Sequence, residues 1–347
     1  MAASPITGLS FGIEMEMLIK PKSNKLVESV AGDAATSSSG DENSKNRNRI
    51  KLRENLARMM TIGGIPAGLQ TRDYSAWTLA DEQTLDEVDG YWRIEFISLI
   101  LFSNEPWQEH ITAFFDLLYM HCDIILTHGC STHVHVSPAK NGKPLYYTIQ
   151  QLRTLMKAIS FYDEPITRIM PADRKNNQWA QSSLQGPKAR PELKTAYSSV
   201  PSASWMPLFA IFDQVTMRPM VYLCFGQDRY VSWNFAHVTD ACGSVEFRRP
   251  PGVNSAKDAE FWIAFTLGFV QNSFETDWDT LKNQSYYPSV GQLSDFAQAG
   301  VRRLGPSAAA ALRRRLIEED TSPATVYSKA ELESIKKKKT DKKKKSK

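Results

Sequence analysis

The stretch 11–18 alternates charged and apolar residues. Read as a β-strand with a period of two, it places Glu14 and Glu16 on one face and Ile13 and Met15 on the other. Carboxylates are depleted from strands, because an ionised group that loses its water without gaining a partner is strongly destabilising. The pattern therefore predicts a strand with one core face and one polar face whose charges need compensating partners.

A second stretch, 129–137, carries two of the chain's six histidines. Its valines and threonine favour a strand, and alternation places His133 and His135 on one face with Val134 and Val136 on the other. A histidine pair of this spacing occurs in ordinary half-buried strands as well as in metal sites. On its own, the pair indicates a hydrated strand face whose side chains could coordinate a metal ion. The case for a metal site depends on the rest of the chain.

Two further apolar runs contain charged residues. Glu95 lies inside the nearly continuous hydrophobic run 91–101. In the run 243–250, alternation places Glu246 and Arg248 on one face of a strand. These runs therefore also predict strands whose charged side chains require partners.

The four predicted strands concentrate one kind of chemistry. A solvated strand face normally mixes Thr, Ser, Lys and Gln, and a half-exposed antiparallel sheet of that ordinary kind is the alternative interpretation. Carboxylates with imidazoles suit hard divalent cations, and a guanidinium suits a phosphate. We therefore expect one shared site, formed by Glu14, Glu16, Glu95, His133, His135, Glu246 and Arg248.

Periodicity in the rest of the chain predicts helices between these strands. The predicted helices are 49–60, 104–122, 146–169, 204–212 and 256–276. Within 75–85 we expect a short strand that runs into an acidic turn, and a further strand is predicted at 229–238. This order indicates an α+β fold with mostly antiparallel strands. The polar, basic loop 171–179 is a candidate for gripping a substrate, and an ordinary solvated connection explains it equally well. Neither a GxGxxG motif after a strand nor a GxxxxGK[ST] motif is present, so neither a Rossmann nor a P-loop nucleotide site is supported.

Composition and charge indicate one large domain with polar segments attached. Nine lysines and one aspartate from Lys336 onward contribute +8 to a net charge of +4, which leaves −4 for the other residues. That acidic balance argues against a nucleic-acid surface on the body. We expect an N-terminal extension at 1–8, a catalytic domain at 9–320 with a flexible insertion at about 22–48, and a disordered Lys-rich tail at 321–347.

The expected location follows from cysteines and hydropathy. Four cysteines without CxxC spacing fit a reducing compartment. No charged residue precedes Glu14, so the basic region of a signal peptide is missing, and the longest apolar run, 261–270, is about half the length of a membrane span. We expect an intracellular, cytoplasmic protein without a membrane partner, and the Lys-rich tail would be a route to the nucleus.

On these residues the chain resembles the amidoligase family, particularly its fungal branch, within the glutamine synthetase and glutamate–cysteine ligase superfamily of carboxylate–amine ligases. The resemblance covers about residues 9–275. It implies a mostly antiparallel curved sheet, like that of the glutamine synthetase catalytic domain, with a polar catalytic face and helices packed on the other side. Glu-x-Glu, His-x-His and Glu-x-Arg strands follow in this order in glutamine synthetases.

Roles for individual residues also follow from this resemblance. The implied metal ligands are Glu14, Glu16, Glu95, His133 and Glu246. The implied nucleotide-binding residues are His135, Arg248, Arg93 and Asn234, the implied substrate-binding residues are Trp77, Asp81, Arg174 and Tyr230, and the implied catalytic residues are Arg248, His135 and Arg174.

The reaction implied is the joining of a carboxylate to an amine at the expense of ATP. An acyl phosphate would activate the acid, with two or more Mg²⁺ ions, or Mn²⁺, screening the triphosphate. The substrates would be small molecules or peptides, and the sequence names neither the acid, the amine, the general base nor the oligomeric state. Two alternatives stay open, a metal-dependent hydrolase that uses the His-x-His pair with a glutamate, and a non-catalytic binding protein with a basic tail.

Overall fold

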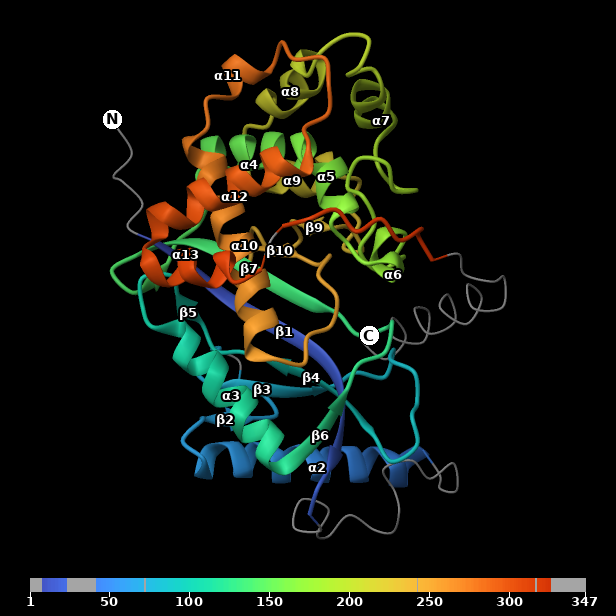
Figure 1. Cartoon of the computed structure of the whole chain (residues 1–347), viewed down its shortest axis with the longest axis vertical. Coiled ribbons are helices and arrows are strands. Elements are labelled where there is room, and N and C mark those ends of the chain that lie inside the picture. Colours follow the sequence, from blue (N-terminus) through green and yellow to red (C-terminus); the bar gives the residue numbers. More distant parts are fainter. Residues whose placement is uncertain (1–7, 24–41, 72, 242, 316, 326–347) are drawn as a thin grey trace.

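The computed structural model describes residues 8–23, 42–71, 73–241, 243–315 and 317–325. Its strands are β1 (Gly8–Pro21), β2 (Ala67–Gly68), β3 (Trp77–Asp81), β4 (Trp92–Ile97), β5 (Leu101–Phe102), β6 (Cys122–Ile125), β7 (Thr132–Lys140), β8 (Lys143–Pro144), β9 (Trp233–Asn234) and β10 (Val245–Phe247). They form one open sheet in the order β2-β3-β4-β1-β7-β10-β9, while β5 and β6 pair with β1 and β8 pairs with β7. Only β2 and β3 pair in parallel, which confirms the predicted α+β class with mostly antiparallel strands (Figure 1).

β1 is the central strand and the longest. It pairs with β4 and β5 along one edge and with β7 and β6 along the other, always antiparallel. The side chains of Ile13, Met15 and Met17 are fully buried, and the alternate positions Glu14 and Glu16 point to the opposite face. The two faces predicted from the sequence are therefore present.

The helices are α2 (Glu42–Ile62), α3 (Trp107–His121), α4 (Ile149–Phe161), α5 (Asp163–Arg168), α6 (Ala172–Lys175), α7 (Pro191–Ser198), α8 (Met206–Asp213), α9 (Pro219–Cys224), α10 (Ala256–Glu275), α11 (Trp278–Leu281), α12 (Val290–Leu304) and α13 (Pro306–Arg313). Two of them, α3 and α10, cover the apolar face of the sheet (Figure 1). Phe265 of α10 lies 5.9 Å from Phe247 of β10, and Phe114 of α3 lies 5.2 Å from Phe96 of β4, measured between ring centroids. The carboxylates of β1 therefore face away from these two helices.

α10 packs against α12 by direct contact of the two backbones. A Cβ atom added to Gly300 would lie 1.8 Å from the carbonyl oxygen of Gly268, and one added to Gly268 would lie 2.4 Å from the carbonyl oxygen of Ala297. Only glycine permits this approach. This close contact fixes the position of α10, whose side chains pack against the apolar face of the sheet.

Two predicted helices have different bounds. The helix predicted at 49–60 begins earlier, at Glu42, so the end of the segment predicted as an insertion belongs to α2. The helix predicted at 146–169 breaks at Tyr162 into α4 and α5. Pro165 explains the break, because proline has no N–H to donate and its ring collides with the carbonyl four residues earlier, that of Phe161.

The strand predicted at 229–238 is reduced to the two residues of β9. Hydrogen bonds to other segments replace the expected ladder, since Ser232 N donates to Gln181 O (2.6 Å) and Gln181 N donates to Tyr230 O (3.0 Å). The side-chain oxygen of Asn234 then accepts from Ala236 N (2.9 Å) and turns the chain.

Parts of the predicted attached segments lie outside the described residues, namely 1–7 of the extension, 24–41 of the insertion and 326–347 of the tail. The described end of the chain, 317–325, runs along α5 and α6. Asp320 N donates to Arg168 O and Thr325 N donates to Ala172 O, both at 2.9 Å. Across the described residues, every helix is too short or too polar to cross a bilayer.

Candidate functional site

The sheet register brings charged residues of four strands onto one face. Residues that lie opposite each other in an antiparallel pair point to the same side of the sheet. The opposed pairs are Glu16 with Glu95, Glu14 with His133, and His135 with Glu246. The structure therefore places six of the seven residues of the predicted site on one face, and the contacts of Arg248 add the seventh.

Glu14 bridges the two histidines of β7. Its Oε2 lies 3.0 Å from Nδ1 of His133, and its Oε1 lies 3.1 Å from Nε2 of His135. Within the described part of the chain, that buried Nε2 makes no hydrogen bond of good geometry, and a second carboxylate oxygen, Glu246 Oε1, lies 3.7 Å from it. A buried ring nitrogen aimed at carboxylate oxygens is typical of a coordinating position.

Glu246 and Arg248 form a buried ion pair at the next strand. Nη1 of Arg248 donates to Oε1 of Glu246, whose side chain is only 2% exposed. Oε2 of Glu246 accepts from Nδ2 of Asn234 at 2.7 Å. Asn234 thus holds the carboxylate in place, and the backbone N–H of Arg248 is fixed by a 2.9 Å bond to Ser232 O.

A second acidic group lies on the other side of Glu14. Oε2 of Glu16 accepts from the hydroxyl of Ser131 at 2.6 Å and from its backbone N–H at 3.0 Å. The ligand oxygens of Glu16, Glu95 and Glu82 lie within 4.8 Å of one another. Glu82, whose side chain is buried, was missed by sequence reasoning, which selected the preceding residue, Asp81.

Burial and neighbouring charges shift the pKa values of three glutamates on this face in different directions. Burial raises the pKa of Glu16, and the nearby Glu82 raises it further. Burial acts against ionisation of Glu14 as well, but the two histidines outweigh it and hold the pKa of Glu14 well below its usual range. Burial is likewise outweighed at Glu246, where Arg248 lowers the pKa to about 2.

Imidazole supplies the missing positive charge. Burial would lower the pKa of His135, yet Glu14 and Glu246 raise it to about 8. The carboxylates therefore favour a positive charge between them, which a protonated His135 supplies.

The donor set fits divalent cations. Three groups of ligand atoms each lie within 4.8 Å: Glu14, Glu95 and His133; Glu14, His135 and Glu246; and Glu16, Glu82 and Glu95. Carboxylate oxygens with one imidazole match the ligand preference of Mg²⁺ and Mn²⁺. Like charges directly opposite on neighbouring strands, as at Glu16 and Glu95, are destabilising unless a cation lies between them.

Two predicted substrate residues do not join this face. Trp77 is 1% exposed, and its ring stacks on Phe114 of α3 at 4.3 Å, so it belongs to the core. Asp81 points the same way as Trp77 by alternation, and its Oδ2 lies 3.1 Å from Nε of Arg49 on α2. Neither side chain therefore joins the polar face, and contact of either residue with a substrate stays a prediction. The strand period, counted from Trp77, was the signal that could have moved the choice from Asp81 to Glu82.

Two predicted arginines contact the protein itself. Arg174 is 1% exposed, and its guanidinium donates to the carbonyl oxygens of Arg249 (3.0 Å) and Arg248 (2.6 Å). Arg93 donates to Leu85 O at 3.2 Å. Arg174 therefore holds the backbone of the Glu-x-Arg segment in place. Contact of either arginine with a substrate or nucleotide stays a prediction.

Tyr230, the remaining predicted substrate residue, lies near Arg248. Its ring meets that of Trp179 at 5.2 Å, and the carbonyl oxygen of Trp179 accepts from Nε of Arg248 at 3.5 Å. The side chain of Tyr230 is 7% exposed. Its position beside the site agrees with the prediction without testing the contact.

A mostly antiparallel open sheet with α3 and α10 on one face, and carboxylates, imidazoles and an arginine on the other, defines an α+β protein with groups of side chains that could hold a metal ion. The sequence model of the family described as "putative amidoligase enzyme" matches residues 7–270. The chain belongs to this family, which indicates an amide-bond-forming ligase with small-molecule substrates. A comparison with curated proteins finds no match.

Proposed function

We propose that the protein is an ATP- and Mg²⁺-dependent carboxylate–amine ligase that forms an amide through an acyl phosphate, as in the glutamine synthetase and glutamate–cysteine ligase superfamily. The substrates are an amino acid or peptide and an amine. One observation carries the proposal: five carboxylates gather with two histidines and Arg248 on one sheet face, in three overlapping groups of ligand atoms. Family membership supplies the class of reaction.

The carboxylates and one imidazole would hold the cations. Glu14 and Glu95 each belong to two of the groups, so neighbouring ions would share them. When bound, Mg²⁺ supplies charge screening for the triphosphate and polarises its terminal phosphoryl group. Mn²⁺ has similar ligand preferences and would serve as well.

Arg248 would stabilise charge as the phosphoryl group moves to the acid. Its planar guanidinium is held by Glu246 and by the carbonyl oxygen of Trp179, so its direction is set before the substrate arrives. Asn234 and Arg174 act on the same strand as positioning residues, because the first fixes the Glu246 carboxylate and the second fixes the carbonyl of Arg248. His135 would face the phosphates from β7.

A metal-dependent hydrolase is less well supported by this geometry. Catalytic zinc usually binds two or three histidines on one ion, whereas His133 and His135 fall in separate groups of ligand atoms. Metal analysis of the purified protein distinguishes the two functions, since tightly held zinc would favour the hydrolase. A non-catalytic binding protein with a basic tail would retain its binding only while residues 336–347 are present.

ATP turnover tests the proposal directly. We expect cleavage of ATP to ADP and phosphate that depends on Mg²⁺ and on an acid chosen from a panel of amino acids and peptides. Hydroxylamine, added as a surrogate amine, should yield a hydroxamate. Formation of AMP and pyrophosphate would contradict the acyl phosphate, and the absence of any acid-dependent cleavage would contradict the ligase.

A further inference from the structure

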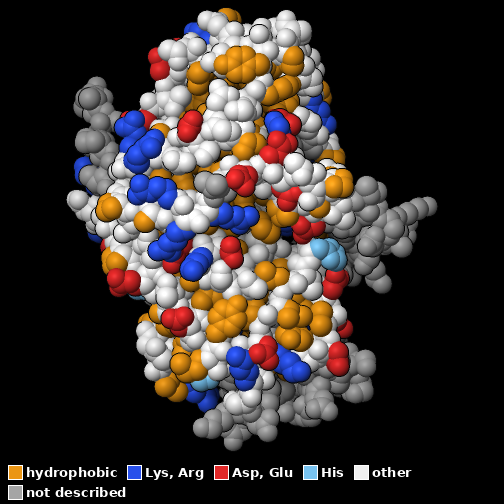
Figure 2. All heavy atoms as spheres, viewed as in Figure 1, with side chains coloured by type: hydrophobic (Ala, Val, Ile, Leu, Met, Phe, Trp, Pro, Cys, Tyr) orange, Lys and Arg blue, Asp and Glu red, His pale blue; other side chains and the backbone are white. Residues whose placement is uncertain are grey.

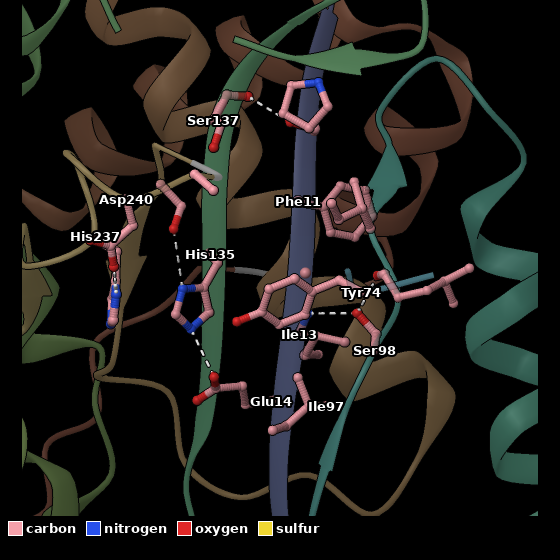
Figure 3. A pocket seen from close by; sticks show the side chains of 17 residues that line it. Phe11, Ile13, Glu14, Tyr74, Ile97, Ser98, His135, Ser137, His237 and Asp240 are labelled. Atoms are coloured by element: carbon pink, nitrogen blue, oxygen red, sulfur yellow. Dashed lines mark hydrogen bonds and ion pairs between the residues drawn. The ribbon is translucent and has the colours of Figure 1, made fainter. Parts of the chain in front are cut away.

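A pocket of about 230 Å³ opens beside Glu14 and His135 and extends along the site face of the sheet (Figure 3). Its floor continues the alternation of the two central strands: Gly12 lies opposite His135, and Ser10 lies opposite Ser137. Small residues thus follow directly after the charged ones on the same face. They leave room where the neighbouring rows carry long side chains.

The walls of the pocket are largely apolar. Ile97 and Tyr74 line one side, and the His237–Asp240 pair lines the other (Figure 3). Leu99 also belongs to the lining. Tyr74 has a φ of +51°, which is costly for a bulky residue and persists only where the surrounding structure enforces it. The backbone of Tyr74 is fixed by a 3.0 Å bond from Ile100 N. Its ring is therefore held at the pocket in a strained conformation.

The charges on the lining are all negative or titratable. Among the described residues around the pocket, Glu14 and Asp240 are the acidic ones, and neither lysine nor arginine is present. Oδ2 of Asp240 lies 2.7 Å from Nδ1 of His237. Arg248 does not line the pocket. Its guanidinium donates to Oε1 of Glu246, which lies 3.7 Å from Nε2 of His135, so Glu246 links the guanidinium to the edge of the pocket.

We propose that this pocket binds the amine substrate, and that this substrate is a small primary amine with an apolar substituent. The inference rests on the proposed ligase function and names the class of its nucleophile. An ammonium group suits the carboxylate of Asp240, and the aromatic face of Tyr74 adds a cation–π contact. The apolar substituent would lie along Ile97 and Leu99. An acid or phosphate would meet neither lysine nor arginine in the described lining.

The volume of the pocket also favours a small amine over a nucleotide as its ligand. Pockets for drug-sized ligands measure roughly 300–1,000 Å³, so a cavity of about 230 Å³ holds one small group and not a whole nucleotide. The position beside Glu14 and His135 would deliver the amino group next to the place where the acid is activated. The triphosphate would lie on the Arg248 side of His135, outside the pocket lining.

Gly12 offers a way to fill the pocket without breaking the strand. A Cβ atom added there would meet the hydroxyl oxygen of Ser98 at 3.6 Å, an ordinary contact. Gly291 on α12 has the same nearest distance, 3.6 Å from the hydroxyl oxygen of Ser289, far from the pocket in the chain. Gly12→Val is therefore the test variant and Gly291→Val its matched control.

The test is ligand-observed NMR of n-pentylamine binding to the full chain, with pentanoate and 1-pentanol as matched probes. We expect n-pentylamine to bind more tightly than both. Gly12→Val should weaken its binding at least tenfold, and Gly291→Val should leave it unchanged. Asp240→Asn should weaken it by about two- to fivefold, the effect of one half-exposed charge. Pentanoate binding as tightly as n-pentylamine would overturn the proposal.

A competition arm distinguishes the nucleotide and the proposed function. ATP with Mg²⁺ should bind Gly12→Val as it binds the parent, and loss of ATP binding in that variant would assign the pocket to the nucleotide. If the parent turns over ATP, Gly12→Val should raise the KM for the amine and leave the KM for ATP unchanged. A parent that never cleaves ATP would contradict the ligase function, while the NMR result would still decide whether the pocket selects an amine.

Discussion

Glu246 shows, at the scale of single residues, how a buried carboxylate can serve a cation and an arginine together. Glu246→Gln keeps its shape and removes one negative charge from a group of ligand atoms that includes Glu14 and His135. We expect ATP turnover to fall and a higher Mg²⁺ concentration to restore part of it. Steady-state rates over a Mg²⁺ titration measure the effect, and a loss of turnover that no Mg²⁺ concentration changes would contradict the metal role.

Substitution of Arg248, unlike that of Glu246, should cause a loss of turnover that Mg²⁺ does not restore. Arg248→Ala removes a donor that matters most while charge develops, and the expected loss is about a hundred- to a thousandfold in turnover, without rescue by Mg²⁺. Arg248→Lys should recover only part, because an ammonium is a point charge and not a planar fork. Melting curves must accompany the rates, since Glu246 loses its buried ion pair. A folded Arg248→Ala protein with parental turnover would remove Arg248 from the site.

Glu82 separates the two ends of the acidic face. Glu82→Gln changes only the group formed with Glu16 and Glu95, so we expect the protein to bind one Mn²⁺ ion fewer than the parent. The number of bound ions can be counted by electron paramagnetic resonance of free Mn²⁺. Glu105→Gln, at an exposed position, is the control. Equal stoichiometry in the parent and in Glu82→Gln would show that this group holds no ion.

Single residues of the site were predictable where strand alternation alone decides. Glu14, Glu16 and His133 needed only a period of two, and the register then brought them together. Glu82 was missed in favour of Asp81, although the strand period counted from Trp77 places Asp81 on the core side of β3 and Glu82 on the other side. The bracing role of Arg174 depends on a contact 74 residues away, which no local pattern contains.

At the scale of elements, the segment 317–325 braces α5 and α6. Arg168 pairs with Glu319, and Nζ of Lys175 donates to the carbonyl oxygens of Asp320 (2.5 Å) and Ser322 (2.6 Å). α6 carries Arg174, which in turn holds the carbonyl of Arg248. The segment therefore supports the site without touching it.

Shortening the chain tests this support. Ending it after residue 316 should lower the melting temperature by a few degrees and reduce ATP turnover, because α6 loses the main-chain and ion-pair contacts of that segment. Ending it after residue 325 is the control and should change neither. Equal behaviour of the two shortened chains would show that 317–325 contributes nothing to α6.

The contact between α10 and α12 is the most exacting in the core. Gly300→Ala would place a methyl group 1.8 Å from a carbonyl oxygen, so the helices must separate. Overpacking of this kind costs about 1–3 kcal/mol or more, and we expect the melting temperature to fall by roughly 5 °C or more. Gly291→Ala, in the same helix but with its nearest neighbour at 3.6 Å, should change it little. Thermal unfolding followed by circular dichroism measures both.

Elements were predictable where one periodicity runs without interruption. α10 was expected at 256–276 and is found at Ala256–Glu275. The break between α4 and α5 follows from Pro165, which disrupts the preceding helical turn although the apolar stripe continues through it. The strand expected at 229–238 failed because its backbone groups bond to the segment around Gln181, a pairing set by tertiary contacts.

At the scale of the whole molecule, the sheet keeps its negative charges on one face and its core on the other. Bound cations should therefore stabilise the folded chain. At a concentration one hundred times the dissociation constant, a ligand adds about 2.7 kcal/mol, which corresponds to roughly 4 °C in melting temperature for a chain of 347 residues. We expect such a shift with Mg²⁺ or Mn²⁺ and none with NaCl of the same ionic strength. Glu14→Gln, which affects two groups of ligand atoms, should lose most of the shift.

β1 has a further consequence for how this protein can change over evolutionary time. One inserted or deleted residue before Gly12 would exchange the two faces of the strand, and Ile13 with Met15, or Met15 with Met17, would occupy the positions of Glu14 and Glu16. Because four strands pair with β1, the cation ligands, the pocket floor and the core would be lost in one step. Tolerated length changes should therefore be absent from β1 among descendants of this sequence. New substrate preferences would arise instead by substitutions at the pocket wall, at Tyr74, Leu99 and Ala241.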